Sequence, residues 1–359
     1  MHLPTLWFII IAIFWTGYFI LEGFDFGVGI LLPVLGRDET ERRVLINTIG
    51  PVWDGNEVWV IVAGGATFAA FPDWYATLFS GFYLALLLIL LALIIRGVAF
   101  EYRGQRNDAT WKARWDLAIV VGSLVPAILW GVAFANILHG VPIDGKGEYT
   151  GTFFTLLNPY ALFGGLTSLT LFTLHGAIFL SLKTKGELVE RARAAAVRLA
   201  VVTAVLVAAI LVWTYAGSVS VAETGIVPAV TALCALGLAV AAPFLLRAAR
   251  EGLAFTATLL TIALVTATVF LALYPRVLVS STAEGNDLTI WSTSSAHYTL
   301  VVMTVVALVL TPVVLLYQGW TYYVFRHRIG RDDLEPPKSP LDLLSRTGGA
   351  GGPGTTAGD

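Results

Sequence analysis

Residues 7–32 read WFIIIAIFWTGYFILEGFDFGVGILL, a run of apolar and aromatic side chains that contains two charged residues. About twenty predominantly apolar residues are enough for a helix to cross the hydrocarbon core of a bilayer. We therefore predict that this run spans a membrane. It is not expected to be a cleaved signal peptide, because it lacks a basic region, is too long, and holds Glu22 and Asp25.

Similar runs recur along the chain. Hydrophobic residues make up 57% of the 359 residues and charged residues only 13%, whereas a soluble chain of this length would need more surface charge. We predict nine spans, near residues 7–32, 52–72, 77–100, 117–139, 159–182, 197–217, 226–247, 253–274 and 299–325. The predicted fold class is an all-α integral membrane protein. Residues 1–329 would form one polytopic membrane domain, and the Gly- and Pro-rich residues 330–359 a disordered cytoplasmic tail.

The basic residues indicate how the chain is oriented. Of the 22 lysines and arginines, all but Lys146 and Arg276 lie in the C-terminal segment or around the loops that follow odd-numbered spans. Cytoplasmic loops of membrane proteins carry such an excess of positive charge. We therefore expect the N-terminus outside and the C-terminus in the cytoplasm, which fits an odd number of spans.

Ionisable residues gather near the cytoplasmic ends of the first three predicted spans. Asp25 lies about 27 Å along the first helix at 1.5 Å per residue, Asp54 opens the second span, and Arg96 ends the third. Glu22 precedes Asp25 by three positions, and Glu57 follows Asp54 by three, so each pair shares one side of its helix. We expect these side chains to form one polar cluster that opens to the cytoplasm.

An ionisable group within a membrane is costly, and it indicates a functional site by default. We predict that Asp54, Asp25 and Glu57 relay protons, while Arg96 pairs with a carboxylate or binds an anion such as a haem propionate. Two structural alternatives stay open. Asp54 and Glu57 could serve only the N-terminal turn of a helix, where negative charge is favoured. Asp25 could take part only in an ion pair between helices.

The chain has few residues able to hold a metal or a haem. Cys234 is the only cysteine, which excludes a Cys-ligated zinc or iron–sulfur site and a covalent haem attachment. Of five histidines only His175 lies well inside a predicted span, and there are two methionines. We predict no metal site in this chain. His175 is either a packed polar residue or a ligand of a haem or quinone. No nucleotide-binding or nucleic-acid-binding signature is present.

Several motifs resemble subunit II of the cytochrome bd-type quinol oxidases. They occur in the family's order from about residue 7 to residue 325. The matching segments are Gly23-Phe24-Asp25-Phe26-Gly27-Val28-Gly29, Thr40-Glu41-Arg42-Arg43, Trp53-Asp54-Gly55-Asn56-Glu57-Val58-Trp59, Ala63-Gly64-Gly65-Ala66, Phe79-Ser80-Gly81-Phe82-Tyr83, Gly131-Val132-Ala133-Phe134-Ala135-Asn136, Leu156-Leu157-Asn158-Pro159 and the loop from Ser280 to Met303.

This resemblance implies a bacterial plasma-membrane protein of nine helices, mostly in two four-helix bundles. Its partner would be a larger subunit I, which carries two haems b and one haem d and oxidises quinol with O2. Small single-helix accessory subunits, and a quinone or lipid bound to this chain, are left open. So is the choice between ubiquinol and menaquinol. Stabilising subunit I and lining a cytoplasmic proton path would be the tasks of this chain, in an enzyme whose turnover generates a membrane potential.

The resemblance also gives roles to single residues. Asp25 and Asp54 correspond to acidic positions near the family's cytoplasmic proton route, Arg96 to its basic position, and Trp59 to a tryptophan near a proposed gas route to haem d. One position departs from the family: Ser292 follows Trp291 where related chains often have an aspartate.

Two other functions are compatible with buried acids. A proton-coupled secondary transporter would use Asp25 and Asp54 as coupling acids, but it should show inverted repeats. We find no matching acid pair in the last four predicted spans. A purely structural membrane scaffold would tolerate neutral replacement of both acids.

Overall fold

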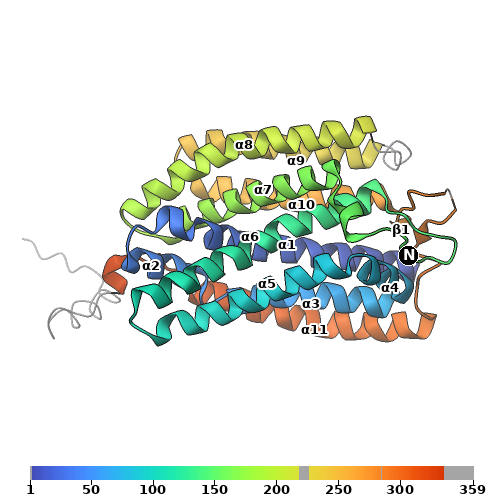
Figure 1. Ribbon diagram of the computed structural model, residues 1–359, viewed down its shortest axis with the longest axis horizontal. Coiled ribbons are helices and arrows are strands. Elements are labelled where there is room, and N and C mark those ends of the chain that lie inside the picture. Colours follow the sequence, from blue (N-terminus) through green and yellow to red (C-terminus); the bar gives the residue numbers. More distant parts are fainter. Residues whose placement is uncertain (1, 218–225, 284, 335–359) are drawn as a thin grey trace, which may run out of the picture.

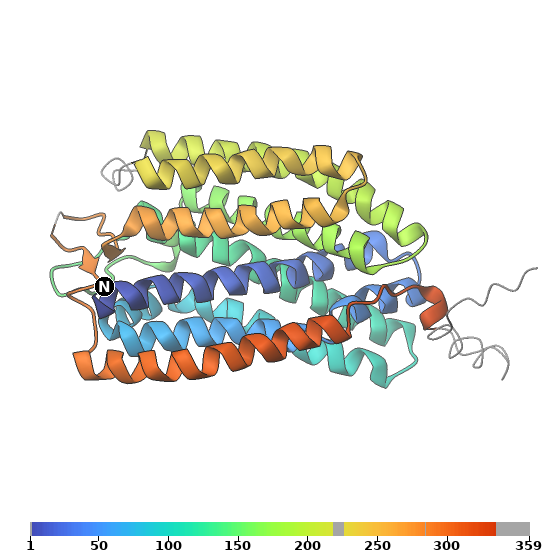
Figure 2. The same cartoon turned by 180° about the vertical axis from the view of Figure 1, so that it is seen from behind.

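The computed structural model describes residues 2–217, 226–283 and 285–334, and its long helices run roughly parallel to the long axis of the molecule (Figures 1 and 2). The helices are α1 (Leu3–Leu35), α2 (Glu39–Ile49), α3 (Trp53–Ala70), α4 (Pro72–Gly81), α5 (Tyr83–Tyr102), α6 (Ala109–His139), α7 (Pro159–Lys183), α8 (Glu187–Gly217), α9 (Ile226–Arg247), α10 (Glu251–Leu273) and α11 (His297–Val324). Short 3-10 helices are η1 (Arg103–Gln105), η2 (Phe153–Leu157) and η3 (Arg331–Asp333), and the strands β1 (Arg276–Leu278) and β2 (Leu288–Thr289) pair antiparallel.

Within the described residues, eight helices are long and apolar enough to cross a membrane. They are α1, α5 (extended by η1), α6, α7, α8, α9, α10 and α11. The chain is therefore an all-helical, multi-pass membrane protein. The second predicted span corresponds to α3, which is 18 residues long but carries Asp54, Asn56 and Glu57 in its first turns. A ninth span thus stays a prediction.

The third predicted span begins too early. We expected it over residues 77–100, but α4 ends at Gly81 and α5 starts at Tyr83, with Phe82 between them. The helices α6 and α8 instead extend about eight to ten residues beyond the predicted spans. These extensions carry charged residues such as Lys112 and Arg191, which form ion pairs beyond the apolar segments.

The long helix α1 is the centre of the packing, in contact with α3, α6 and α7. The helices α7, α8, α9 and α10 pack one on the next, and α10 returns to α7. In both views α8 and α9 lie along one edge of the molecule and α11 along the opposite edge (Figures 1 and 2). Leu300 is the one residue of α11 that is buried within the described chain.

Two glycines let α1 approach α7 closely. A Cβ on Gly27 would lie 2.2 Å from the Phe172 carbonyl oxygen, and a Cβ on Gly176 would lie 2.5 Å from the Gly27 backbone. Small residues allow such contact between membrane helices. Gly55 at the start of α3 makes no such contact, because no atom of the described chain lies within 4 Å of a Cβ built there.

Ion pairs join the segments at the α2 end of the molecule, which is also where the basic loops lie (Figure 1). Arg103 pairs with Glu39 and with Asp116, and Arg331 pairs with Asp38 at 2.7 Å. The side of the membrane that this end faces stays a prediction. Of the predicted tail, residues 335–359 lie outside the described residues, whereas residues 330–334 include η3 and its ion pairs.

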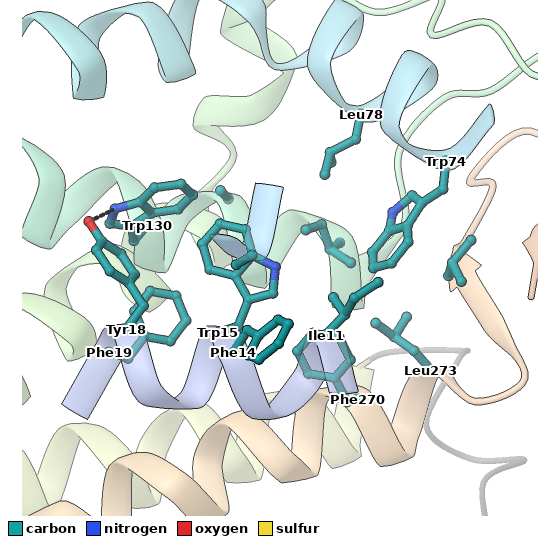
Figure 3. Close-up of a cluster of buried hydrophobic side chains, with 14 of the residues drawn as sticks. Ile11, Phe14, Trp15, Tyr18, Phe19, Trp74, Leu78, Trp130, Phe270 and Leu273 are labelled. Atoms are coloured by element: carbon teal, nitrogen blue, oxygen red, sulfur yellow. Dashed lines mark hydrogen bonds between the residues drawn. The ribbon is translucent and has the colours of Figure 1, made fainter. Parts of the chain in front are cut away.

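Aromatic side chains fill the core between α1, α6 and α10 (Figure 3). Trp15 packs edge-on against Trp130 with ring centroids 4.9 Å apart, and the Trp130 indole N–H donates a 3.1 Å hydrogen bond to the Tyr18 hydroxyl. Large rings in offset or edge-on contact add to the stability gained by burial. This core holds α1 in place, and α1 carries two of the acidic residues of the candidate site.

Candidate functional site

A buried ion pair lies between α1 and α5. Arg96, in the last two turns of α5, pairs with Glu22 of α1, and both side chains are fully buried. The Arg96 guanidinium also lies over two rings, with its Cζ atom 4.8 Å from the Phe26 centroid and 5.9 Å from the Phe100 centroid. A permanently charged group is thus held away from water. Breaking such a pair would leave an uncompensated buried charge.

The start of α3 supplies the next two acids. Oε2 of Glu57 lies 3.6 Å from Nη2 of Arg96, and its side chain is 20% exposed. Asp54 lies one turn earlier on the same side of α3 and is exposed. The helix N-cap residue, Val52, makes no capping hydrogen bond with its side chain. The acids therefore extend from the exposed first turn of α3 to the buried ion pair.

Asp25 is fully buried on α1 and binds a different partner. Its Oδ2 accepts a 2.8 Å hydrogen bond from the side-chain amide of Asn56. The Asn56 carbonyl oxygen accepts two further hydrogen bonds from α11, from the Gln318 amide at 3.1 Å and from the Tyr322 hydroxyl at 2.8 Å. Asp25 is thus connected to α11 through one amide group.

Several polar atoms of this charged cluster have no hydrogen-bond partner within the described residues. Glu22 Oε2, Asp25 Oδ1, and Nε and Nη1 of Arg96 are buried and have no hydrogen-bond partner there. Three carboxyl groups, two of them fully buried, face a single guanidinium. Because unpaired charge is costly in a low-dielectric interior, the arrangement favours binding of a proton or of another cation. This is chemistry suited to proton transfer.

The two remaining candidate residues make ordinary packing contacts. The Trp59 indole N–H donates a 2.9 Å hydrogen bond to the Gln318 side-chain oxygen, and its role near a gas route stays a prediction. His175 is fully buried, with Nδ1 2.8 Å from the Thr258 hydroxyl and its ring stacked on Phe255 at 4.4 Å. Its Nε2 is buried and has no hydrogen-bond partner among the described residues. The two alternatives for His175, a packed polar residue or a ligand of a haem or quinone, both stay predictions.

A separate apolar cavity of about 140 Å³ lies between α6, α7, α8 and α10. Its lining includes Phe134, Tyr160, Leu171, Ile210 and Val269. The cavity does not include any residue of the charged cluster. Whether a quinone or lipid binds this chain stays a prediction.

Residues 3–325 match the sequence family described as "Cytochrome bd terminal oxidase subunit II". The chain belongs to this family. It is 42% identical over 332 residues to cytochrome bd ubiquinol oxidase subunit 2 of Bacillus subtilis, with 92% of this chain and 98% of that protein covered. It is 40% identical to cytochrome bd-I ubiquinol oxidase subunit 2 of Escherichia coli K12, with 93% and 97% covered.

The fold is similar to that of a solved relative. A chain in the structure of bd oxidase from Geobacillus thermodenitrificans superimposes with a TM-score of 0.75 at 19% identity, covering 90% of this chain and 97% of that one. As a cytochrome bd subunit II, the chain is a multi-pass bacterial membrane protein and part of an oxidoreductase complex that contains haem and a subunit I. The relatives named here give no support to the alternative of a proton-coupled transporter.

The structure brings Glu22, Asp25, Glu57 and Arg96 together and leaves Asp54 one turn away at the surface of the described chain. Sequence reasoning missed the partners on the other side of Asp25, which are Asn56, bound to Asp25 itself, and Gln318 and Tyr322, bound to the Asn56 oxygen. A signal was present in the last predicted span. Gln318 and Tyr322 are hydrogen-bonding residues four positions apart in an apolar helix, and thus lie on one face.

Proposed function

We propose that this subunit II lines a proton path that begins at Asp54, continues through Glu57 to the buried Arg96–Glu22 pair, and reaches Asp25. The observation that supports it most is the graded burial of the acids along α3 and α1: Asp54 is exposed, Glu57 is partly exposed, and Asp25 is fully buried. A proton path needs titratable groups that lead from the surface of the protein to its interior. The positive charge of Arg96 stabilises ionised carboxyl groups at the buried end of the path.

The family and the arrangement of charges support a wider proposal. We infer that α3 is the ninth span, since it packs along α1, and that the helices form two four-helix bundles with the N-terminus outside. The basic residues at the α2 end would then face the cytoplasm. Subunit I would carry two haems b and one haem d and oxidise quinol with O2, in keeping with relatives named as ubiquinol oxidases.

Replacing Asp54 by Asn tests the path in the complex purified with its partner. We expect one of two results. Either quinol-driven oxygen consumption falls by about tenfold or more, because proton transfer by a positioned group contributes typically 10²–10⁴-fold to the rate, or the haems fail to assemble. A reduced-minus-oxidised spectrum reports haem content. Asp54→Glu keeps the carboxylate and should retain most activity.

The matched control is Asp73→Asn, because Asp73 is also an exposed acid in the first turn of a helix, α4. An Asp54→Asn enzyme with full haem content, full activity and an unchanged pH dependence would reject the path. Equal losses in the Asp54 and Asp73 variants would instead indicate that both acids serve only their helix ends.

A further inference from the structure

The Asn56 amide is held from three sides in the interior of the molecule. Its nitrogen donates to Oδ2 of Asp25, and its oxygen accepts from the Gln318 amide and the Tyr322 hydroxyl of α11. A carboxamide nitrogen only donates and its oxygen only accepts. The two donors on α11 therefore determine which way the amide faces, and they keep its N–H directed at Asp25.

This orientation makes the two oxygens of Asp25 unequal. Oδ2 is occupied by the Asn56 donor, whereas Oδ1 is buried and has no hydrogen-bond partner among the described residues. The Tyr322 hydroxyl is separated from Asp25 by the amide, whose nitrogen has no free lone pair with which to accept a proton. Protons can therefore be exchanged at Oδ1 but not through the α11 side.

We propose that Asn56, oriented by Gln318 and Tyr322, is a positioning residue that fixes the Asp25 carboxyl and restricts its proton exchange to Oδ1. The proposal rests on the proposed function of Asp25 in proton transfer. It also gives α11 a task that its packing alone does not suggest. This helix has one residue buried in the described chain, yet it supplies both donors that hold the amide.

The other groups around Asp25 explain why a positioned donor matters. The charged and titratable residues that act on it are Glu22 on α1, Glu57 on α3, Arg96 on α5 and Tyr322 on α11. With two further carboxyls nearby, a mobile Asp25 could exchange partners with Glu22 for Arg96. The Asn56 hydrogen bond opposes this exchange, because it would be lost if the Asp25 side chain turned.

The mildest test removes one donor in the assembled, haem-containing complex. Tyr322→Phe should lower kcat about fivefold, the effect expected for one lost buried hydrogen bond, with an unchanged KM for quinol. The pH profile of kcat should also change, since a weakened donor alters the stability of the Asp25 carboxyl in its ionised form. The control is Tyr323→Phe, because Tyr323 is the adjacent, exposed tyrosine. Equal kcat values and pH profiles in the two variants would overturn the proposal.

A double-mutant cycle shows whether the effect passes through Asp25. On an Asp25→Asn background, Tyr322→Phe should cause no further change in turnover, because the two residues act as one unit. A fivefold loss that persists on this background would overturn the proposal. If Asp25→Asn alone leaves turnover and pH profile unchanged, the proton path through Asp25 fails as well. A slow Asp25→Asn enzyme, together with a Tyr322→Phe replacement that changes nothing in the otherwise unaltered chain, rejects only the positioning role.

Discussion

Arg96 is the single positive charge inside the cluster of buried carboxyls. Its guanidinium pairs with Glu22, approaches Glu57 and lies over the Phe26 ring. A buried ion pair adds little net stability relative to well-packed apolar residues, whereas loss of one partner strands the other charge. Replacing one residue of this pair should therefore destabilise the protein much more than replacing both.

We expect Arg96→Gln to destabilise the complex by about 3–5 kcal/mol, because Glu22 is left buried without its partner. The measurement is the temperature at which the purified complex loses its haem spectrum. Adding Glu22→Gln should recover much of the loss, since the stranded charge is then removed. Arg106→Gln is the control, because Arg106 is exposed and lies over the Trp111 ring. A single variant as stable as this control would contradict the prediction.

The crossing of α1 and α7 fixes the position of the α1 acids. Gly23 and Gly27 face α7, while Glu22 and Asp25 face α3 and α5. Gly176→Ala would place a methyl group within 2.7 Å of the Gly27 backbone and of the Val28 nitrogen. The helices would have to move apart, and overpacking of this kind costs typically about 1–3 kcal/mol.

We therefore predict a lower melting temperature of the complex for Gly176→Ala, measured by thermal unfolding in detergent. Gly237→Ala on α9 is the matched control, because no atom of the described residues lies within 4 Å of a Cβ built there. Since Ala favours a helix more than Gly does, this control should be neutral or slightly stabilising. Equal melting temperatures for both variants would show that α1 and α7 can separate freely.

The elements show what the sequence could and could not predict. Eight predicted spans coincide with long apolar helices, because length and hydropathy decide which segments cross a bilayer. The case of α3 was harder, since the acids that mark it as functional also lower its hydropathy. That Asp25 and Arg96 lie toward the C-terminal ends of α1 and α5 followed from their places in the predicted spans. Their partners did not, because helix rotation decides whether Glu22 or Asp25 meets Arg96.

Contacts between distant segments were beyond sequence reasoning for a related reason. Gln318 reaches Asn56 across 262 positions of sequence, and periodicity within one helix does not indicate which neighbour that helix meets. The polar pair on α11 could have been noticed, but its target could not. The motif Thr40-Glu41-Arg42-Arg43 was likewise recognised without a role, and its role lies in joining distant parts of the molecule.

At the scale of the whole molecule, the start of α2 connects helices from both halves of the chain. The Glu41 carboxylate accepts from Arg191 of α8 at 2.5 Å, from Arg331 of η3 at 3.2 Å and from the Arg37 backbone N–H at 2.9 Å. Burial acts to raise the pKa of Glu41, but the Arg191 guanidinium and the Arg37 N–H outweigh it and hold the pKa below its ordinary value. The Glu41 backbone N–H, with help from Arg331, likewise lowers the pKa of Asp38.

A carboxylate whose pKa is lower in the folded protein stabilises the fold above its ordinary pKa, and this stabilisation is lost as the pH falls through the folded value. For Glu41 the loss should begin below about pH 4.5, the ordinary value for a glutamate. We predict that Glu41→Gln melts at a lower temperature than the parent near pH 7 and that the difference shrinks on acidification below this point. Thermal unfolding over a pH series measures both effects. Glu187→Gln, at an exposed acid in the first turn of α8, is the control and should show no such convergence. A Glu41→Gln difference that stays constant with pH would mean that the side chain's packing, and not its charge, joins α2 to α8.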